Sequence, residues 1–479
     1  MNYNQLSIFF WRSGCYNAIC KAFSLTDRRS CKMRKSLAVL SVLALATSLL
    51  AGCGSKSGNE SSKDNAASPS ASQQASSSSA AAGGEKVTLT VTHFMVEKPK
   101  VDTFKKLTDR FTELHPNVSF DIQVMPVDKY NDNIKMKVAA ADEPDIIFGR
   151  PQGMVDMTKA GAFLDITNEP FIKRVDPAYI PNVSYDGKVY GLPVDLMTNG
   201  IIYNKDLFKQ AGVEVPKTYS ELVKAAETLQ SKGITPFAAS WKDGASYMSF
   251  MWPDMWGGML VKNPDYAGAI MAGQKKFSDI PDYKGFLERV NQLSAMTNKD
   301  AKDIDYDRAL QYFAQGKAAM IIMGSFAIGT IRSYNPDGNF GVFMYPSYDN
   351  ANDNYLTYST DDTWMIGAQS KHVDEAKQFF EFMASDEGAQ IWADGVQTIS
   401  TISKDIKPKQ QDPMASDFQA IFQTGKTVNN QVKPLWYGQY DDSWQKVMTY
   451  FLVSDPKTRS VDDTLKKLDD EFARINKMK

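Results

Sequence analysis

After residue 86, the apolar and polar residues of the chain alternate with two different periods. Val87, Leu89 and Val91 alternate with threonines, and residues 118–124 show the same alternation. This period is typical of half-buried strands. Between the two segments, apolar residues recur at helical spacing over 101–114. The opening unit is therefore predicted to be strand, helix, strand.

Later segments continue this alternation of strands and helices. A short buried strand is predicted at 145–148. Amphipathic helices are predicted at 218–233, 373–383 and 461–475. The first of these helices begins with a capping box formed by Thr218 and Glu221. The pattern indicates an α/β fold with mainly parallel sheets, in which ligands bind at the carboxyl ends of strands.

A different pattern lies upstream, at residues 33–53. Arg34 and Lys35 precede an apolar run at 37–50, which has the length of a secretory signal and is short for a transmembrane helix. The run ends in Leu-Ala-Gly-Cys at 50–53, which resembles a bacterial lipobox. The resemblance implies that a signal peptide at 33–52 is removed and that Cys53 carries acyl chains. The protein would then be anchored to the cell membrane on its extracytoplasmic face. A cleaved soluble signal or a plain anchor helix is the alternative.

The positions of the four cysteines agree with this interpretation. Cys15, Cys20 and Cys31 precede Cys53, and none follows it. The mature chain could therefore form no internal disulfide and no cysteine metal site. Residues 1–32 fit no part of a signal peptide, so we interpret them as an upstream extension and Met33 as the true start. An unusually long signal n-region is the alternative.

The composition after Cys53 indicates a tether followed by a large body. Residues 53–85 are mostly Ser, Ala, Gly, Asn and Gln, which cannot bury enough apolar surface to fold. The body from 86 to 479 is long enough for two lobes. The formal net charge of −2 gives no basic surface of the kind that binds nucleic acid.

No catalytic constellation stands out. The three histidines, His93, His115 and His372, are scattered, and zincin, nucleophile-elbow, redox-cysteine and phosphate-loop motifs are absent. The acidic doublets at 361–362 and 441–442 are paired carboxylates of the kind that glycosidases use. Such doublets are also common at turns and helix starts, so we expect no enzyme, no cofactor and no bound metal.

Aromatic residues gather in stretches that resemble loops. Segment 240–258 contains Trp241, Tyr247, Phe250, Trp252 and Trp256. Sugars stack their C–H faces on aromatic rings and need fixed polar partners for their hydroxyl groups, so such a set suits a carbohydrate cleft. The alternative for each ring is a place in the hydrophobic core. Trp392 and Trp444, which fall on predicted helices, are expected in the core.

Several segments of the body resemble the extracytoplasmic solute-binding proteins of ABC sugar importers, the maltose-binding-like group. In the usual order of that family, they are FTELHPNV at 111–118, EPDIIF at 143–148, YGLP at 190–193, IIYNKDLF at 201–208, FAQGKAAM at 313–320 with Gly324, FGVFMYP at 340–346, and a helix pair at 371–392. Each segment alone is a weak signal. Their order, behind a lipobox and a tether, makes the resemblance specific.

The resemblance implies a two-lobe fold like that of type II periplasmic binding proteins, with crossing strands that act as a hinge. The N-terminal lobe would comprise 86–195 plus 347–405, and the C-terminal lobe 196–346 plus 406–479. Segment 340–346 would be the return crossing between the lobes.

The resemblance also implies a set of ligand-binding residues on loops that follow strands. This set is Phe94, Glu97, Arg150, Gln152, Asp195, Met197, Trp241, Tyr247, Trp252, Ser325, Phe326, Trp364 and Trp436. Two positions depart from the family pattern. Gly149 and Phe326 stand where many relatives carry an aromatic residue and a tryptophan, respectively. One stacking platform is therefore lost or moved, and the identity of the sugar does not carry over.

The implied function is non-catalytic. A lipid-anchored monomer would capture a sugar, with an oligosaccharide expected, and deliver it to the permease subunits of an ABC transporter. Glu97, Arg150 and Asp195 would bind the sugar hydroxyl groups. The alternatives are the same fold with a peptide or polyamine ligand, a secreted glycoside hydrolase, and an adhesin or signalling co-receptor.

Overall fold

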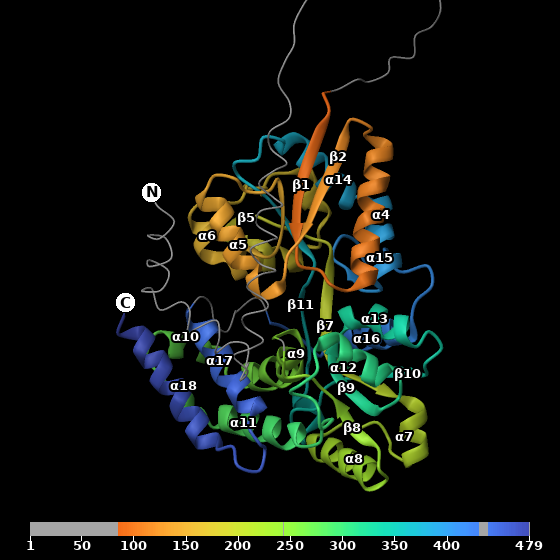
Figure 1. The fold of residues 1–479 in the computed structure, drawn as a ribbon, viewed down its shortest axis with the longest axis vertical. Coiled ribbons are helices and arrows are strands. Elements are labelled where there is room, and N and C mark those ends of the chain that lie inside the picture. Colours follow the sequence, from red (N-terminus) through yellow and green to blue (C-terminus); the bar gives the residue numbers. More distant parts are fainter. Residues whose placement is uncertain (1–84, 243, 431–438, 479) are drawn as a thin grey trace, which may run out of the picture. The chain divides into compact units, whose positions relative to one another are not determined.

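The computed structural model describes residues 85–242, 244–430 and 439–478 (Figure 1). The predictions for the upstream extension, the signal peptide and the lipidated Cys53 lie outside these residues, as do those for Trp436 and all of the tether except Glu85. Residues 81–479 form one compact unit. Within the described ranges, no helix combines the length and the apolar character that a bilayer crossing requires.

A five-stranded sheet organises the first lobe, with the strand order β2-β1-β3-β12-β6. Its strands are β1 (Val87–His93), β2 (Val118–Val124), β3 (Ile146–Phe148), β6 (Leu192–Pro193) and β12 (Thr363–Ile366). β1 is parallel to β2 and β3, whereas β12 is antiparallel to β3 and β6. The helices are α4 (Lys98–Leu114), α5 (Val127–Ala139), α6 (Val155–Lys159), α14 (Val373–Met383) and α15 (Asp386–Val396). A small hairpin, β4 (Ser184–Tyr185) with β5 (Lys188–Val189), lies apart from this sheet.

The apolar stripe of α4 builds the core of this lobe. Phe104, Leu107 and Phe111 are at most 1% exposed, and they share one core with the strands of the sheet. Phe104 stacks on Trp364 of β12, and Phe111 meets Phe379 of α14 edge to face. The helical period of the sequence therefore places one face of α4 against the sheet.

A seven-stranded sheet organises the second lobe. Its main order is β14-β11-β7-β9-β8, and β10 and β13 also pair with β7. The strands are β7 (Asp195–Asn204), β8 (Thr235–Ala238), β9 (Ala318–Gly324), β10 (Phe340–Phe343), β11 (Leu356–Thr360), β13 (Ile399–Ser400) and β14 (Thr427–Asn429). The helices are α7 (Lys205–Ala211), α8 (Tyr219–Ser231), α9 (Gly244–Asp254), α10 (Tyr266–Met271), α11 (Pro281–Ser294), α12 (Tyr306–Ala314), α13 (Ile328–Tyr334), α16 (Pro413–Gln423), α17 (Gln439–Val453) and α18 (Val461–Asn476).

The two faces of this sheet are covered by separate cores. Successive residues of β7 point to opposite faces, so Ile201 packs with α9 and α11 whereas Ile202 packs with α12 and α16. The core on the Ile201 face also contains Trp241, Trp256 and Trp444. Trp392 and Trp444 are 2% and 1% exposed, as expected for residues of the core.

The return crossing between the sheets lies later than predicted. β10, within segment 340–346, pairs with β7 in the second sheet, and so does β11. The chain enters the first sheet only at β12, so Asp361 and Asp362 form the return. Residues 356–360 therefore belong to the second sheet, not to the first lobe as the 347–405 boundary implied. Residues 356–360, LTYST, show the alternation of a strand, but this pattern does not indicate which of the two sheets the strand joins.

Candidate ligand-binding site

The carboxyl ends of both sheets meet at the crossing strands. In the second sheet, β8, β9, β11 and β14 run in one direction, and β7 runs against β9 and β11. In the first sheet, β6 has the direction of β1 and β3 and leads into β7. Ligands of open α/β sheets bind at the carboxyl edge, so the site is expected where these two edges face each other.

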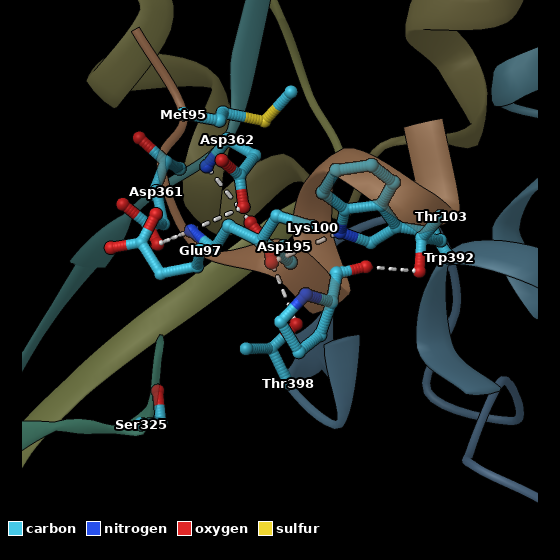
Figure 2. Close-up of polar contacts among 12 residues, drawn as sticks. Met95, Glu97, Lys100, Thr103, Asp195, Ser325, Asp361, Asp362, Trp392 and Thr398 are labelled. Atoms are coloured by element: carbon cyan, nitrogen blue, oxygen red, sulfur yellow. Dashed lines mark hydrogen bonds and ion pairs between the residues drawn. The ribbon is translucent and has the colours of Figure 1, made fainter. Parts of the chain in front are cut away.

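A buried ammonium group ties helix α4 to the return crossing. Nζ of Lys100, on α4, lies 2.6 Å from Oδ2 of Asp361 and 2.7 Å from Oδ2 of Asp362 (Figure 2). The side chain of Lys100 is 6% exposed and that of Asp362 is fully buried. Removing either partner would leave an uncompensated buried charge.

Asp195 ties three passages of the chain together. Its Oδ1 accepts a hydrogen bond of 2.9 Å from the backbone N–H of Asp362. Its Oδ2 accepts bonds from Nε1 of Trp392, at 3.0 Å, and from Oγ1 of Thr398, at 2.6 Å (Figure 2). Asp195 begins β7, Asp362 lies in the return crossing and Thr398 precedes β13, so all three passages are fixed at one carboxylate.

Burial and mutual interaction shift the pKa of each of these groups. Burial alone would lower the pKa of Lys100, but Asp361, Asp362 and Asp195 raise it well above 10.5, so the ammonium stays charged. Burial raises the pKa of Asp362 well above 3.8, and the charge of Asp195 raises it further. Burial also raises the pKa of Asp195, against the opposing effect of Lys100. Lys100 contacts Asp361 and Asp362 directly, and the buried guanidinium of Arg150 also interacts electrostatically with both carboxylates.

Asp195, Asp361 and Asp362 offer carboxylate oxygens within 4.8 Å of one another, a spacing that a metal ion could use. The ammonium of Lys100 already contacts two of these carboxylates, and protein donors occupy both oxygens of the third. The acidic doublet at 361–362 is thereby engaged in the crossing and is not an open pair of carboxylates of the glycosidase kind.

In the first lobe, the structure places the predicted residues near this crossing. Phe94 follows β1 and meets the rings of Tyr130 and Phe148 edge to face. Glu97 is half-buried and precedes α4. Nη1 of Arg150 donates a 2.9 Å hydrogen bond to the carbonyl of Thr360, and burial lowers the pKa of this guanidinium.

Gln152 lies in the same loop as Arg150, but its side chain forms hydrogen bonds within the first lobe. Its Nε2 donates to the carbonyls of Pro181 and Ser184, at 3.1 and 3.0 Å. Gly149, where an aromatic platform is missing, has a φ of 147°. A side chain at Gly149 would strain the backbone, because L residues rarely adopt this φ, and its Cβ atom would lie 2.8 Å from Cε of Met154.

Two of the predicted ligand residues are buried in contacts within the protein. Trp364 is 0% exposed and stacks on Phe104 with ring centroids 4.4 Å apart, which places it in the core and not in a cleft. Asp195 is also 0% exposed, and both of its oxygens already accept hydrogen bonds from the protein. Met197 is 4% exposed on β7, two residues into the crossing.

The predicted ligand residues of the second lobe differ in how deeply they are buried. Trp241 is 6% exposed and lies edge to face on Phe250, within the core. Trp252 is half-buried and lies edge to face on Trp256, 5.2 Å away. Oγ of Ser325 accepts a hydrogen bond from the backbone N–H of Thr198. The backbone of Tyr247 lies on α9, its side chain is outside the described part of the structure, and Trp436 lies outside it altogether.

Phe326 belongs to the second lobe but contacts the first. Nζ of Lys100 lies 5.9 Å from the centroid of its ring, within the range of a cation–π contact. Nearby, Gly329 on α13 packs against Pro99 of α4 so closely that a Cβ atom would lie 2.5 Å from Cγ of Pro99. The two lobes therefore touch along α4 and α13.

Sequence reasoning missed Lys100. It occupies the buried stripe of α4 that continues at Phe104, Leu107 and Phe111. A charged residue on an apolar helix face needs a buried partner of opposite charge, so the existence of such a partner could have been predicted from the sequence. The identity of the partners was not, because Asp361 lies 261 residues away.

The model of one protein family, described as bacterial extracellular solute-binding protein, matches residues 97–390. The matched residues include strands of both sheets, from β2 to β12, and the crossings between them. The chain belongs to this family of solute-binding proteins.

Named relatives of this solute-binding protein extend over most of the chain. The multiple sugar-binding protein of Streptococcus mutans is 26% identical over 438 residues, which covers 89% of this chain and 96% of the relative. The melibiose/raffinose/stachyose-binding protein MelE of Bacillus subtilis is 24% identical and covers 64% of this chain and 73% of the relative.

A solved structure described as RafE in complex with raffinose has the same fold as this solute-binding protein. The TM-score is 0.68 at 24% identity, and the match covers 82% of this chain and 100% of RafE. The likeness confirms the two-lobe α/β fold that the sequence motifs implied.

Proposed function

We propose that this solute-binding protein captures an oligosaccharide and delivers it to an ABC transporter. The observation that carries the proposal is the meeting of two carboxyl edges at one set of crossings. Glu97 and Arg150 come from the first lobe, and Phe326 and Trp252 come from the second. Polar and aromatic groups from both sides suit a ligand with hydroxyl groups and C–H faces.

The names of the relatives support a sugar as the ligand. MelE is named for melibiose, raffinose and stachyose, and the RafE structure is described as a complex with raffinose. A ligand that contacts both lobes binds the closed form better than the open one, so binding would shift the hinge equilibrium. Closure over a sugar is a non-catalytic step.

The proposal includes a lipid anchor at Cys53 and a monomeric body that meets permease subunits. The lipobox-like sequence at 50–53 and the Ser/Ala-rich tether that follows support the anchor. Replacement of Cys53 by serine should release the protein from the membrane fraction of cells. Membrane association that survives Cys53→Ser would overturn the anchor and leave sugar capture untouched.

The ligand class is tested by thermal unfolding of the purified protein with a panel of compounds. The panel contains raffinose, stachyose, maltotriose, xylotriose, chitotriose, a tripeptide and spermidine. A ligand present at a hundred times its Kd adds about 2.7 kcal/mol to the stability, which raises the melting temperature by several degrees. A shift with a sugar supports the proposal, whereas a shift only with the peptide or spermidine contradicts it.

A further inference from the structure

Polar side chains without partners gather on one face of the second sheet, beside the crossing. They are Asn199, Thr357 and Ser359, which are 1%, 0% and 0% exposed. Among the described residues, both ends of the Asn199 amide and the hydroxyls of Thr357 and Ser359 have no hydrogen-bond partner. Buried polar atoms are nearly always paired in folded proteins, so a group of unpaired atoms indicates a missing partner.

The strand register places these side chains together. Asn199 of β7 is directly opposite Thr357 of β11, and Met197 is directly opposite Ser359. Residues opposite each other in a sheet project to the same face, as do residues two apart on one strand. The three side chains therefore form one patch, which we call the polar floor (Asn199, Thr357 and Ser359).

Two glycines lie directly against the polar floor, and the ring of Phe326 also lies beside it at Gly324. Gly324 of β9 is directly opposite Asn199 on its other side, and a Cβ atom there would lie 3.0 Å from Oδ1 of Asn199. Gly257, in the π-helical segment Met255–Leu260, faces Thr357, and a Cβ atom there would lie 3.1 Å from Cγ2. A π-helical segment beside unpaired polar groups is typical of functional sites.

The neighbours of the polar floor suit a sugar. It shares its sheet face with Ile201, whose core includes Trp256 and borders Trp252. The indole N–H groups of Trp252 and Trp256 are buried and have no partner among the described residues. Asn430, which follows β14, likewise has an unpaired buried Oδ1.

We infer that the polar floor, formed by Asn199, Thr357 and Ser359, is the subsite that binds sugar hydroxyl groups at the base of the second lobe. The amide of Asn199 can donate and accept at the same time, which matches two adjacent hydroxyls of one sugar ring. The hydroxyls of Thr357 and Ser359 would bind the neighbouring oxygens. This inference rests on the proposed function, since it names residues of that same site.

Apolar replacements of the same shape separate this role from simple packing. Thr357→Val, Ser359→Ala and Asn199→Leu each remove unpaired polar atoms, so the melting temperature without ligand should stay the same or rise. The Kd for the tightest sugar of the panel should rise at least tenfold for each variant. Thr330→Val is the matched control, because Thr330 has a buried, unpaired hydroxyl on α13, which packs with the core on the other face of the sheet.

Calorimetric titration of the wild type and the four variants with that sugar decides the inference. A tenfold or greater loss of affinity in the three floor variants, with an unchanged Kd in Thr330→Val, supports it. If the wild type binds a sugar and all floor variants bind within twofold of it, the inference is wrong and the proposed function stands. If the wild type binds no sugar, both fail. Should Asn199→Leu not fold, the other two floor variants decide.

Discussion

Nζ of Lys100 lies 2.7 Å from Oδ2 of Asp362, and this contact joins helix α4 to the return crossing between the sheets. The side chain of Asp362 is fully buried, and its backbone N–H donates to Asp195 at the start of β7. Asp362 is thus linked both to α4 of the first lobe and to the start of the crossing strand β7.

Replacement of Lys100 by methionine should destabilise the protein by about 3–5 kcal/mol, because buried carboxylates would lose the ammonium group that contacts them. Urea unfolding measures the change. Lys105→Met is the control, since Lys105 pairs with Asp109 on the exposed face of the same helix. That pair is worth about 0.3–0.5 kcal/mol. Equal losses in the two variants would contradict a structural role for the buried pair.

His93 should make the stability fall at acid pH. Burial lowers its pKa from 6.5 to about 4, so between these values the unfolded chain binds a proton that the folded protein does not. Stability therefore decreases as the pH falls from 6.5 towards 4, by up to about 1.4 kcal/mol per pH unit. Below the folded pKa the contribution becomes constant.

His93→Phe tests this contribution, because the ring contacts with Phe104 and Trp364 can be kept. The variant loses the acceptor for the backbone N–H of Met95, so a constant loss of stability is expected as well. The slope of unfolding free energy against pH between 4.5 and 6 is the quantity to compare. An unchanged slope would show that His93 does not titrate as described.

The sequence predicted regular elements better than it predicted their partners. The capping box of Thr218 and Glu221 is present at the start of α8, and β1, β2 and α14 cover their predicted ranges. Helix α4 begins three residues before its apolar stripe, because Pro99 is well suited to a first helical turn. These features depend on neighbours within a few residues.

The surroundings of Asp195 and Trp364 depend on distant residues, and the sequence did not predict them. Asp195 was assigned to the ligand because it begins a crossing. Its donors, Trp392 and Thr398, lie 197 and 203 residues away in the sequence. Trp364 was read as a cleft aromatic, but β12 lies between β3 and β6 and directs its ring onto Phe104. Contacts between residues so far apart in the sequence cannot be predicted from a local sequence pattern.

Trp364→Ala should reduce the stability by about 3–5 kcal/mol, as expected for the loss of a large buried ring. The affinity of the folded protein for its sugar should remain unchanged, because the ring is 0% exposed. Urea unfolding and calorimetric titration below the unfolding transition measure the two quantities. A large loss of affinity with little loss of stability would restore Trp364 to the binding site.

Gly257→Ala should destabilise the protein by about 1–3 kcal/mol through overpacking. The new Cβ atom would lie 2.5 Å from the backbone carbonyl oxygen of Tyr355, which cannot move independently of its strand connection. Gly268→Ala is the control, since nothing lies within 4 Å of a Cβ atom at that position on α10. Thermal unfolding should show a loss for the first variant and no loss for the second. The reverse order would contradict the close packing of the π-helical segment.

Titration calorimetry of the purified protein with raffinose and stachyose, with spermidine as the comparison ligand, tests the central claim most directly. Saturable binding of one sugar per protein molecule, with no heat from spermidine, is the predicted result. Binding of spermidine with no response to these sugars or to the other oligosaccharides of the panel would contradict the claim that this solute-binding protein captures a sugar.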